Sequence, residues 1–157
     1  EQRFERPQSE DLVEHVDEAG AKAMAAAGVV GVLLPTATLS THGGWDNARV
    51  LREAGVTLAL GTDCNPGTSW CESVPYALQL AAPLLGLTVP EAIRAATAGG
   101  GAALRRPELG VLRLTHPGDL LVLEAEHEAD LLAHLGAPAV RTTIVGGVPV
   151  SGARTIH

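Results

Sequence analysis

The residue types best suited to chemistry gather in one short stretch, which reads Thr-Asp-Cys-Asn-Pro-Gly-Thr over residues 62–68. Asp63 supplies a carboxylate, Asn65 an amide and Thr68 a hydroxyl, and Gly67 adds a backbone N–H. A carboxylate taken out of water must be hydrogen-bonded, paired or bound to a metal, because burying it bare costs several kcal/mol or more. The stretch therefore indicates either a site for a metal ion or a polar ligand, or a tight turn that Asp63 caps through an Asx turn.

A buried strand is predicted immediately before this stretch. Residues 56–60 form an apolar run with the length and branching of a strand, and Gly61 ends it. In parallel α/β folds, ligand and metal sites are built just past the carboxyl ends of such strands. We therefore expect Asp63 at that end of a sheet. The loop at 65–68 would then hold a polar heterocycle or an amide, unless it is an ordinary turn.

The other titratable side chains give weaker indications of a functional site. Six histidines are present, and none has the His-x-His or His-x-x-x-His spacing of a local metal pair. His15 and His42 each follow a predicted strand, on the face expected for Asp63, so each is either a site residue or structural. The carboxylate beside Cys64 disfavours a thiolate nucleophile there. Solvent or structural roles are expected for the remaining histidines, His116, His127, His134 and His157.

The elements that position Asp63 alternate between strand and helix. They are expected at residues 11–16, 17–27, 29–34, 45–54 and 56–60, with a loop of Thr, Ser, His and Gly at 36–44. Such alternation with short turns predicts a parallel sheet with right-handed crossovers. Three strands form only an arc of such a sheet and leave two open edges.

The sequence pattern changes after Pro107 from long helical segments to short strands. This change divides the chain into two predicted domains, 1–106 and 107–157. Before it, helices are expected at 72–85 and, opened by a capping box at Thr88, at 88–104, where a run of glycines serves close packing. After it, short strands are expected at 111–114, 119–124, 140–145 and 148–150, with a hairpin turn at 146–147 and a helix at 128–135.

Composition narrows the function classes. The 157 residues are 46% hydrophobic but only 3% aromatic, so a folded core of Ala, Val and Leu is expected. A net charge of −7, with no basic cluster longer than Arg105-Arg106, argues against a nucleic-acid partner or an anionic membrane surface. No apolar run has the roughly 18 residues of a membrane span, and the first residues lack the apolar core of a signal peptide. With two cysteines in no redox spacing, a cytoplasmic protein is expected.

Residues 62–68 also resemble the strand-eight signature of the imidazolonepropionases, the metal-dependent amidohydrolases of histidine degradation. Further segments fall in the order of that family: Val32-Leu33-Leu34-Pro35, Ala96-Thr97-Ala98-Gly99-Gly100 and Gly118-Asp119-Leu120-Leu121-Val122-Leu123. The resemblance extends from about Ser9 onward, to the carboxyl-terminal part of the family only. It implies an α/β fold, namely the carboxyl-terminal portion of a (β/α)8 amidohydrolase barrel followed by part of a small β-rich domain.

The resemblance assigns roles residue by residue. It implies that Asp63 binds one Zn²⁺ or Fe³⁺ ion and relays a proton from the activated water. That water would open the ring of 4-imidazolone-5-propanoate, giving N-formimino-L-glutamate. Asn65, Gly67 and Thr68 fall at positions that hold the substrate in the family, and a homodimer is implied for the whole enzyme.

The chain departs from the family at one catalytic position. The sixth-strand Ser-x-Asp-His is here Ser9-Glu10-Asp11-Leu12, so Leu12 stands where a histidine is expected to polarise the substrate carbonyl. Either the site is impaired, or a shifted register brings His15 into it. One of the family's four protein metal ligands is visible, so we expect the isolated chain to be inactive. Another amidohydrolase, acting on a cyclic amidine, a cyclic amide or an amino group, remains an alternative, as does a non-catalytic remnant of one.

Overall fold

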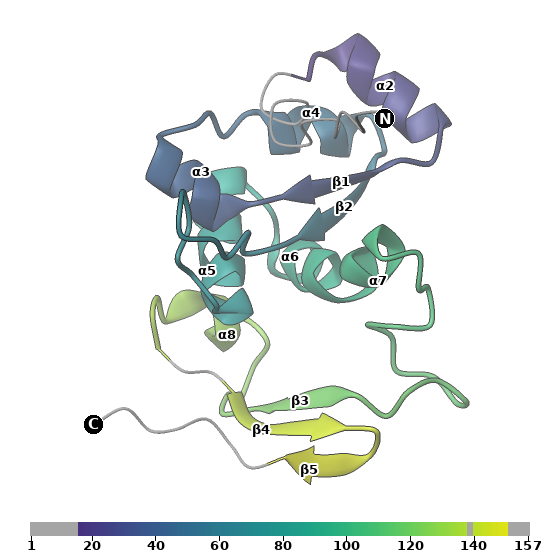
Figure 1. Cartoon of the computed structure of the whole chain (residues 1–157), viewed down its shortest axis with the longest axis vertical. Helices are drawn as coiled ribbons and strands as arrows, with labels where there is room; N and C mark the ends of the chain where they lie inside the picture. The colour runs from purple at the N-terminus through teal and green to yellow at the C-terminus, as the bar shows by residue number, and fades with distance from the viewer. Residues whose placement is uncertain (1–15, 138–139, 151–157) are drawn as a thin grey trace, which may run out of the picture.

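The computed structural model describes residues 16–137 and 140–150 and contains two small sheets (Figure 1). Strands β1 (Val30–Leu33) and β2 (Thr57–Leu60) pair in parallel, with Leu33 opposite Leu60 at their carboxyl ends. The ladder continues one step further, because the Gly61 N–H donates to the Leu33 carbonyl at 3.0 Å. The carboxyl ends of the two strands therefore lie side by side, as the predicted alternation requires.

Two helices accompany this pair of strands, and the first of them has clear capping signals. Helix α2 (Glu18–Ala26) begins at Asp17, whose side chain accepts from the Gly20 N–H at 2.7 Å, and Gly28 follows its end at φ +67°. Helix α4 (Asn47–Glu53) is the last element before β2 in the connection from β1. The predictions for both helices are confirmed to within a few residues. The strand expected at 11–16 lies, apart from its last residue, outside the described residues.

The loop prediction at 36–44 is wrong, because a helix, α3 (Pro35–Thr41), occupies most of it. Proline takes the first helical position, where its missing N–H costs nothing. The Thr38, Ser40 and Thr41 hydroxyls then donate to carbonyls one turn back, at 3.1, 3.2 and 2.9 Å. These bonds give the hydroxyls partners inside the helix, which packs beside α5.

The long helical region after the candidate loop forms as expected. Helix α5 (Val74–Leu85) is capped by Ser73 and ends at Gly86 in the left-handed conformation. Three segments then make one continuous helical run: α6 (Val89–Arg94), the π-helical η1 (Ala95–Gly99) and α7 (Gly100–Ala103). The run lies against β2. The capping box at its start is confirmed. The use of the glycines for close packing is confirmed for Gly99 and Gly101 but not for Gly100.

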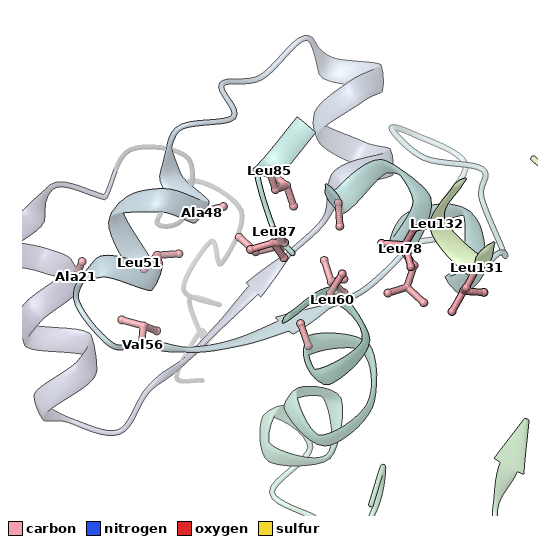
Figure 2. Close-up of a cluster of buried hydrophobic side chains, with 14 residues drawn as sticks. Ala21, Ala48, Leu51, Val56, Leu60, Leu78, Leu85, Leu87, Leu131 and Leu132 are labelled. Atoms are coloured by element: carbon pink, nitrogen blue, oxygen red, sulfur yellow. The ribbon is translucent and has the colours of Figure 1, made fainter. Parts of the chain in front are cut away.

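The core lies between the parallel pair and the helices (Figure 2). It consists of alanine, leucine and one valine, as the scarcity of aromatic residues predicts. Leu131 and Leu132 of the short helix α8 (Asp130–Ala133) belong to the same cluster as Leu78 of α5. Gln79, only 1% exposed, ties this segment further, since its amide nitrogen donates to the Leu131 carbonyl at 3.2 Å and its oxygen accepts from the Gly136 N–H at 2.7 Å.

The second sheet is antiparallel, in the order β3 (Leu120–Leu123), β4 (Val140–Val145), β5 (Val148–Val150). The hairpin at Gly146-Gly147 is confirmed, with both glycines at positive φ. The strand expected at 111–114 is wrong. Within the described part of the chain it finds no pairing partner, and Leu112 and Leu114 are 75% and 94% exposed. The helix expected at 128–135 is shorter, at Asp130–Ala133.

Candidate functional site

The candidate site is the loop that connects β2 to α5. Asp63 lies three residues past the end of β2, half-buried, at φ +48°. For an L-residue this left-handed conformation costs about 1 kcal/mol, and aspartate is among the few that adopt it. Such strain persists only where surrounding contacts fix the backbone, and it concentrates at functional sites.

Asn65 holds this loop from within. Its amide nitrogen donates to the Asp63 backbone carbonyl at 2.6 Å and lies 3.0 Å from the carboxylate oxygen Oδ2 of the same residue. Its amide oxygen accepts from the N–H groups of Gly67 and Thr68, at 2.8 and 2.9 Å. The donors and acceptors around it fix which end of the amide is nitrogen. Asn65 thus orients both the loop and one oxygen of Asp63.

The described residues do not hold the second carboxylate oxygen of Asp63, Oδ1. Within residues 16–137 and 140–150, Oδ1 of Asp63 has no hydrogen-bond or ion-pair partner. A carboxylate with one oxygen anchored and one free can accept a proton or bind a hard or borderline cation. The donor type therefore suits Zn²⁺ or Fe³⁺ as one ligand. No group of three His, Cys, Asp or Glu side chains that could hold a metal occurs in that part of the chain.

Two buried hydroxyls donate hydrogen bonds to Thr62, the residue before Asp63. Thr36, at the start of α3, donates to the Thr62 carbonyl at 2.7 Å, and Ser69 donates to the same oxygen at 2.9 Å. Both side chains are in residues only 4% exposed. The sequence prediction missed them as site residues. The available signal was the position of Thr36, directly after the end of a parallel strand that neighbours the strand of Asp63.

The predicted site residues divide into those that the structure brings together and those that it does not. Asp63, Asn65, Gly67 and Thr68 share one hydrogen-bonded loop, and Thr68 adds its hydroxyl at 2.9 Å from the Asn65 amide nitrogen. His42 ends α3 in the left-handed conformation and is exposed. His15 and Leu12 lie outside the described residues. Cys64 is an exposed free thiol.

Two carboxyl groups outside the candidate loop have lowered pKa values. The pKa of the Glu91 carboxyl lies below its usual range, chiefly because the Thr88 backbone N–H and hydroxyl donate to it and secondarily because the Arg52 guanidinium is near. The Arg106 side chain likewise lowers the pKa of Glu108. Neither group lies in the β2–α5 loop.

Comparison with known proteins identifies the family of the chain. Residues 7–150 match the Amidohydrolase family. Imidazolonepropionase from Salinispora arenicola is 43% identical over 143 residues, which are 90% of this chain and 36% of that protein. Imidazolonepropionase from Streptomyces avermitilis is 45% identical over 132 residues, or 84% of this chain and 32% of that protein. The chain thus spans about a third of the length of the curated relatives it matches.

Solved structures show the same fold. A zinc-bound adenosine deaminase from Xanthomonas campestris superposes with a TM-score of 0.76 at 25% identity, over 87% of this chain and 35% of that one. Guanine deaminase from E. coli gives a TM-score of 0.74 at 21% identity, over 91% of this chain and 38% of that one. In the described part of the present chain, no helix is long and apolar enough to cross a membrane.

Proposed function

This chain belongs to the amidohydrolase family, and we propose that it is the carboxyl-terminal portion of an imidazolonepropionase. Relatives of that name are 40–45% identical to most of its length. The observation that carries the proposal is the position of Asp63, just past a parallel strand, with one carboxylate oxygen anchored and the other open. The enzyme would open 4-imidazolone-5-propanoate to N-formimino-L-glutamate by hydrolysis of a ring C–N bond.

In this proposal residues 1–106 supply the last part of a (β/α)8 barrel and residues 107–157 part of a small β-rich domain. The parallel register of β1 and β2 supports the first assignment, and the antiparallel β3–β4–β5 sheet supports the second. Residues of the complete enzyme outside this chain would supply the remaining metal ligands.

The Asp63 carboxylate performs two tasks in the proposed reaction. Its open oxygen would hold one Zn²⁺ or Fe³⁺ ion, and when bound, such an ion supplies Lewis acidity that activates water near neutral pH. The same carboxylate would accept the proton that the attacking water loses, and return it to the ring nitrogen when the C–N bond breaks. The Asn65 amide at Oδ2 keeps the carboxylate in one orientation during both transfers.

Substrate contact is proposed for the rest of the loop. Gly67 is exposed, so its backbone can approach a planar ring without steric hindrance. The Thr68 hydroxyl lies 2.9 Å from the amide nitrogen and 3.3 Å from the amide oxygen of Asn65, and it can rotate to meet a ligand. Asn65 would contribute mainly by shaping this surface. His15 is proposed as the group that polarises the substrate carbonyl in place of the histidine absent at position 12.

Substitution of Asp63 tests the proposal in an enzyme that contains this chain. Asp63→Asn keeps the side-chain shape but removes the charge and the proton acceptor, so turnover of imidazolone propionate should vanish and metal content should fall. Asp46→Asn is the matched control, because Asp46 is exposed and makes no side-chain cap bond at α4. Near-normal turnover with full metal occupancy in Asp63→Asn would overturn the assignment.

An amino-group hydrolase is the second candidate, favoured by the similarity to the zinc-bound adenosine deaminase. Both reactions can use a strand-end aspartate, so Asp63→Asn alone does not separate them. Assay of the same preparation with adenosine and with imidazolone propionate does. Ammonia release from adenosine, without ring opening of the imidazolone, would replace the first function by the second.

A further inference from the structure

Two side-chain hydroxyls donate hydrogen bonds to the backbone carbonyl of Thr62. An amide oxygen has two lone-pair directions, and here both are used by buried hydroxyls, Thr36 at 2.7 Å and Ser69 at 2.9 Å. The hydroxyls come from different places, because Thr36 lies 26 residues before Thr62 and Ser69 lies seven residues after it. The contact therefore connects the end of β1, the end of β2 and the far side of the candidate loop.

Thr36 differs from the other hydroxyl residues of its helix. Thr38, Ser40 and Thr41 all donate to a carbonyl of the preceding turn. Thr36 instead reaches across to the neighbouring strand end. Because buried hydroxyls nearly always find a partner, the choice of a distant partner indicates a specific tertiary contact.

Fixing this carbonyl fixes Asp63. The Thr62 carbonyl and the Asp63 N–H belong to one planar peptide unit, so holding that oxygen sets the plane that precedes the Asp63 Cα. The following plane is held by the Asp63 carbonyl, which accepts from the Asn65 amide at 2.6 Å. With both planes held, the left-handed backbone of Asp63 and the direction of its Cα–Cβ bond are determined.

We propose that Thr36 and Ser69 are positioning residues, which aim the Asp63 carboxylate by clamping the peptide unit before it. This proposal rests on the proposed function for its catalytic meaning, but the clamp itself is a property of this chain. Neither residue touches the reacting atoms in the scheme above. Their loss should misplace Asp63 by a fraction of an ångström to an ångström, and a misplacement of that size costs up to about 10²-fold in rate.

Paired substitutions separate the hydroxyl from the methyl group of Thr36. Thr36→Val keeps the shape and removes the donor, whereas Thr36→Ser keeps the donor and removes a methyl group. In an enzyme that contains this chain, Thr36→Val and Ser69→Ala should each lower kcat about tenfold to hundredfold with little change in KM, and Thr36→Ser should retain most activity. Thr38→Val is the control, because it removes a hydroxyl bond of the same helix that does not reach Thr62.

A second readout does not depend on activity. In a selectively labelled enzyme that contains this chain, the carbonyl ¹³C shift of Thr62 and the HN–Hα coupling of Asp63, which reports φ, can be measured by NMR. Thr36→Val and Ser69→Ala should change both signals, while Thr36→Ser and Thr38→Val should leave them near the parent values. If Thr36→Val does not fold, Ser69→Ala provides the same measurement.

The two proposals fail differently. Full activity in Asp63→Asn removes the proposed function, and the NMR signals then still decide whether the clamp exists. Unchanged Thr62 and Asp63 signals in Thr36→Val and Ser69→Ala would overturn the clamp. So would a loss of kcat in Thr36→Ser that equals or exceeds the loss in Thr36→Val, because packing and not the hydroxyl would then be responsible.

Discussion

Asn65 shows how one side chain can organise a candidate site from within. Both ends of its amide are used inside the loop, by the Asp63 carbonyl and carboxylate on one side and by two backbone N–H groups on the other. An aspartate at position 65 would still accept from the two backbone N–H groups, but a carboxylate oxygen would replace the amide N–H that faces Asp63. The effect of such a substitution therefore depends on the charge of Asp63.

This dependence predicts a difference between two variants of Asn65. Asn65→Ala removes the bonds at both ends and should lower the free energy of unfolding by about 1–3 kcal/mol at all pH values. Asn65→Asp should cost a similar amount at pH 7 through repulsion about 3 Å from the Asp63 carboxylate, and recover most of it near pH 3 as the pair takes up a proton. Urea unfolding at low protein concentration measures both. A pH-independent loss in Asn65→Asp would show that the two side chains are not in contact.

At this scale the sequence predicts which residues gather but not how they are used. The strand, its breaker Gly61 and the loop composition place Asp63, Asn65, Gly67 and Thr68 together, as observed. Their roles as metal and substrate ligands stay predictions. The contact of Thr36 with Thr62 spans 26 residues, and no local pattern encodes a side-chain bond of that separation.

The π-helical segment η1 shows why an element can require one glycine and not its neighbour. A Cβ at Gly99 would lie 2.1 Å from the backbone oxygen of Leu58 in β2, whereas a Cβ at Gly100 would meet nothing within 4 Å. The sequence indicates close packing for the whole glycine run. It cannot tell which glycine faces the sheet, because that depends on the wider π turn.

Two alanine variants test this packing. Gly99→Ala should lower the free energy of unfolding by about 3 kcal/mol or more, because β2 or the helix must move. Gly100→Ala should raise it by about 0.5–1 kcal/mol through better helix propensity. Thermal unfolding of the two variants side by side is the measurement. Equal effects of the two substitutions would contradict the orientation of the helix on β2.

The capping box of α6 gives an element-level prediction with a pH dependence. Glu91 accepts from the Thr88 N–H at 2.8 Å and hydroxyl at 2.7 Å, which lowers its pKa. A carboxyl whose folded-state pKa is lowered stabilises the fold above about pH 4.5, and this contribution is lost as the pH falls through the folded-state pKa. Because the side chain is 40% exposed, the effect is small.

Glu91→Gln should therefore cost up to about 0.5 kcal/mol at pH 7, and the difference from the parent should shrink toward zero as the pH falls below the folded-state pKa. Urea unfolding across this range measures it. Glu53→Gln is the control, since that carboxylate pairs with Arg49 at the surface of α4. A Glu91→Gln difference that grows on acidification would contradict the capping role.

The secondary-structure predictions are wrong where contacts with other parts of the chain determine the structure. The segment at 35–41 is a helix that begins with a proline and packs beside α5, although threonine and serine are weak helix formers. The apolar residues at 111–114 were predicted as a strand from their type, but a strand needs a neighbour to pair with. Residues 30–33 and 57–60 were predicted well because each is the other's partner.

The whole molecule exposes surfaces that isolated domains usually cover. Among the described residues, β1 and β2 pair only with each other, and Val29 and Val32 are 45% and 37% exposed. On the second sheet, Leu121, Val145 and Val148 are 53%, 53% and 63% exposed. Open strand edges combined with exposed apolar side chains favour association with other chains. In relatives about two and a half times as long, further residues are available to cover such surfaces.

We therefore expect the purified 157-residue chain to associate in solution and to leave imidazolone propionate intact when zinc is added. A single carboxylate does not make a metal site, and the described residues contain no group of three metal-binding side chains. Analytical ultracentrifugation over a range of concentrations and an assay of ring opening measure the two properties. Co-expression with the upstream two-thirds of the Salinispora arenicola imidazolonepropionase should reduce the association, because the added strands can pair with the open edges. A monomeric chain that opens the imidazolone ring by itself would show that these surfaces need no cover and that its own residues complete the site.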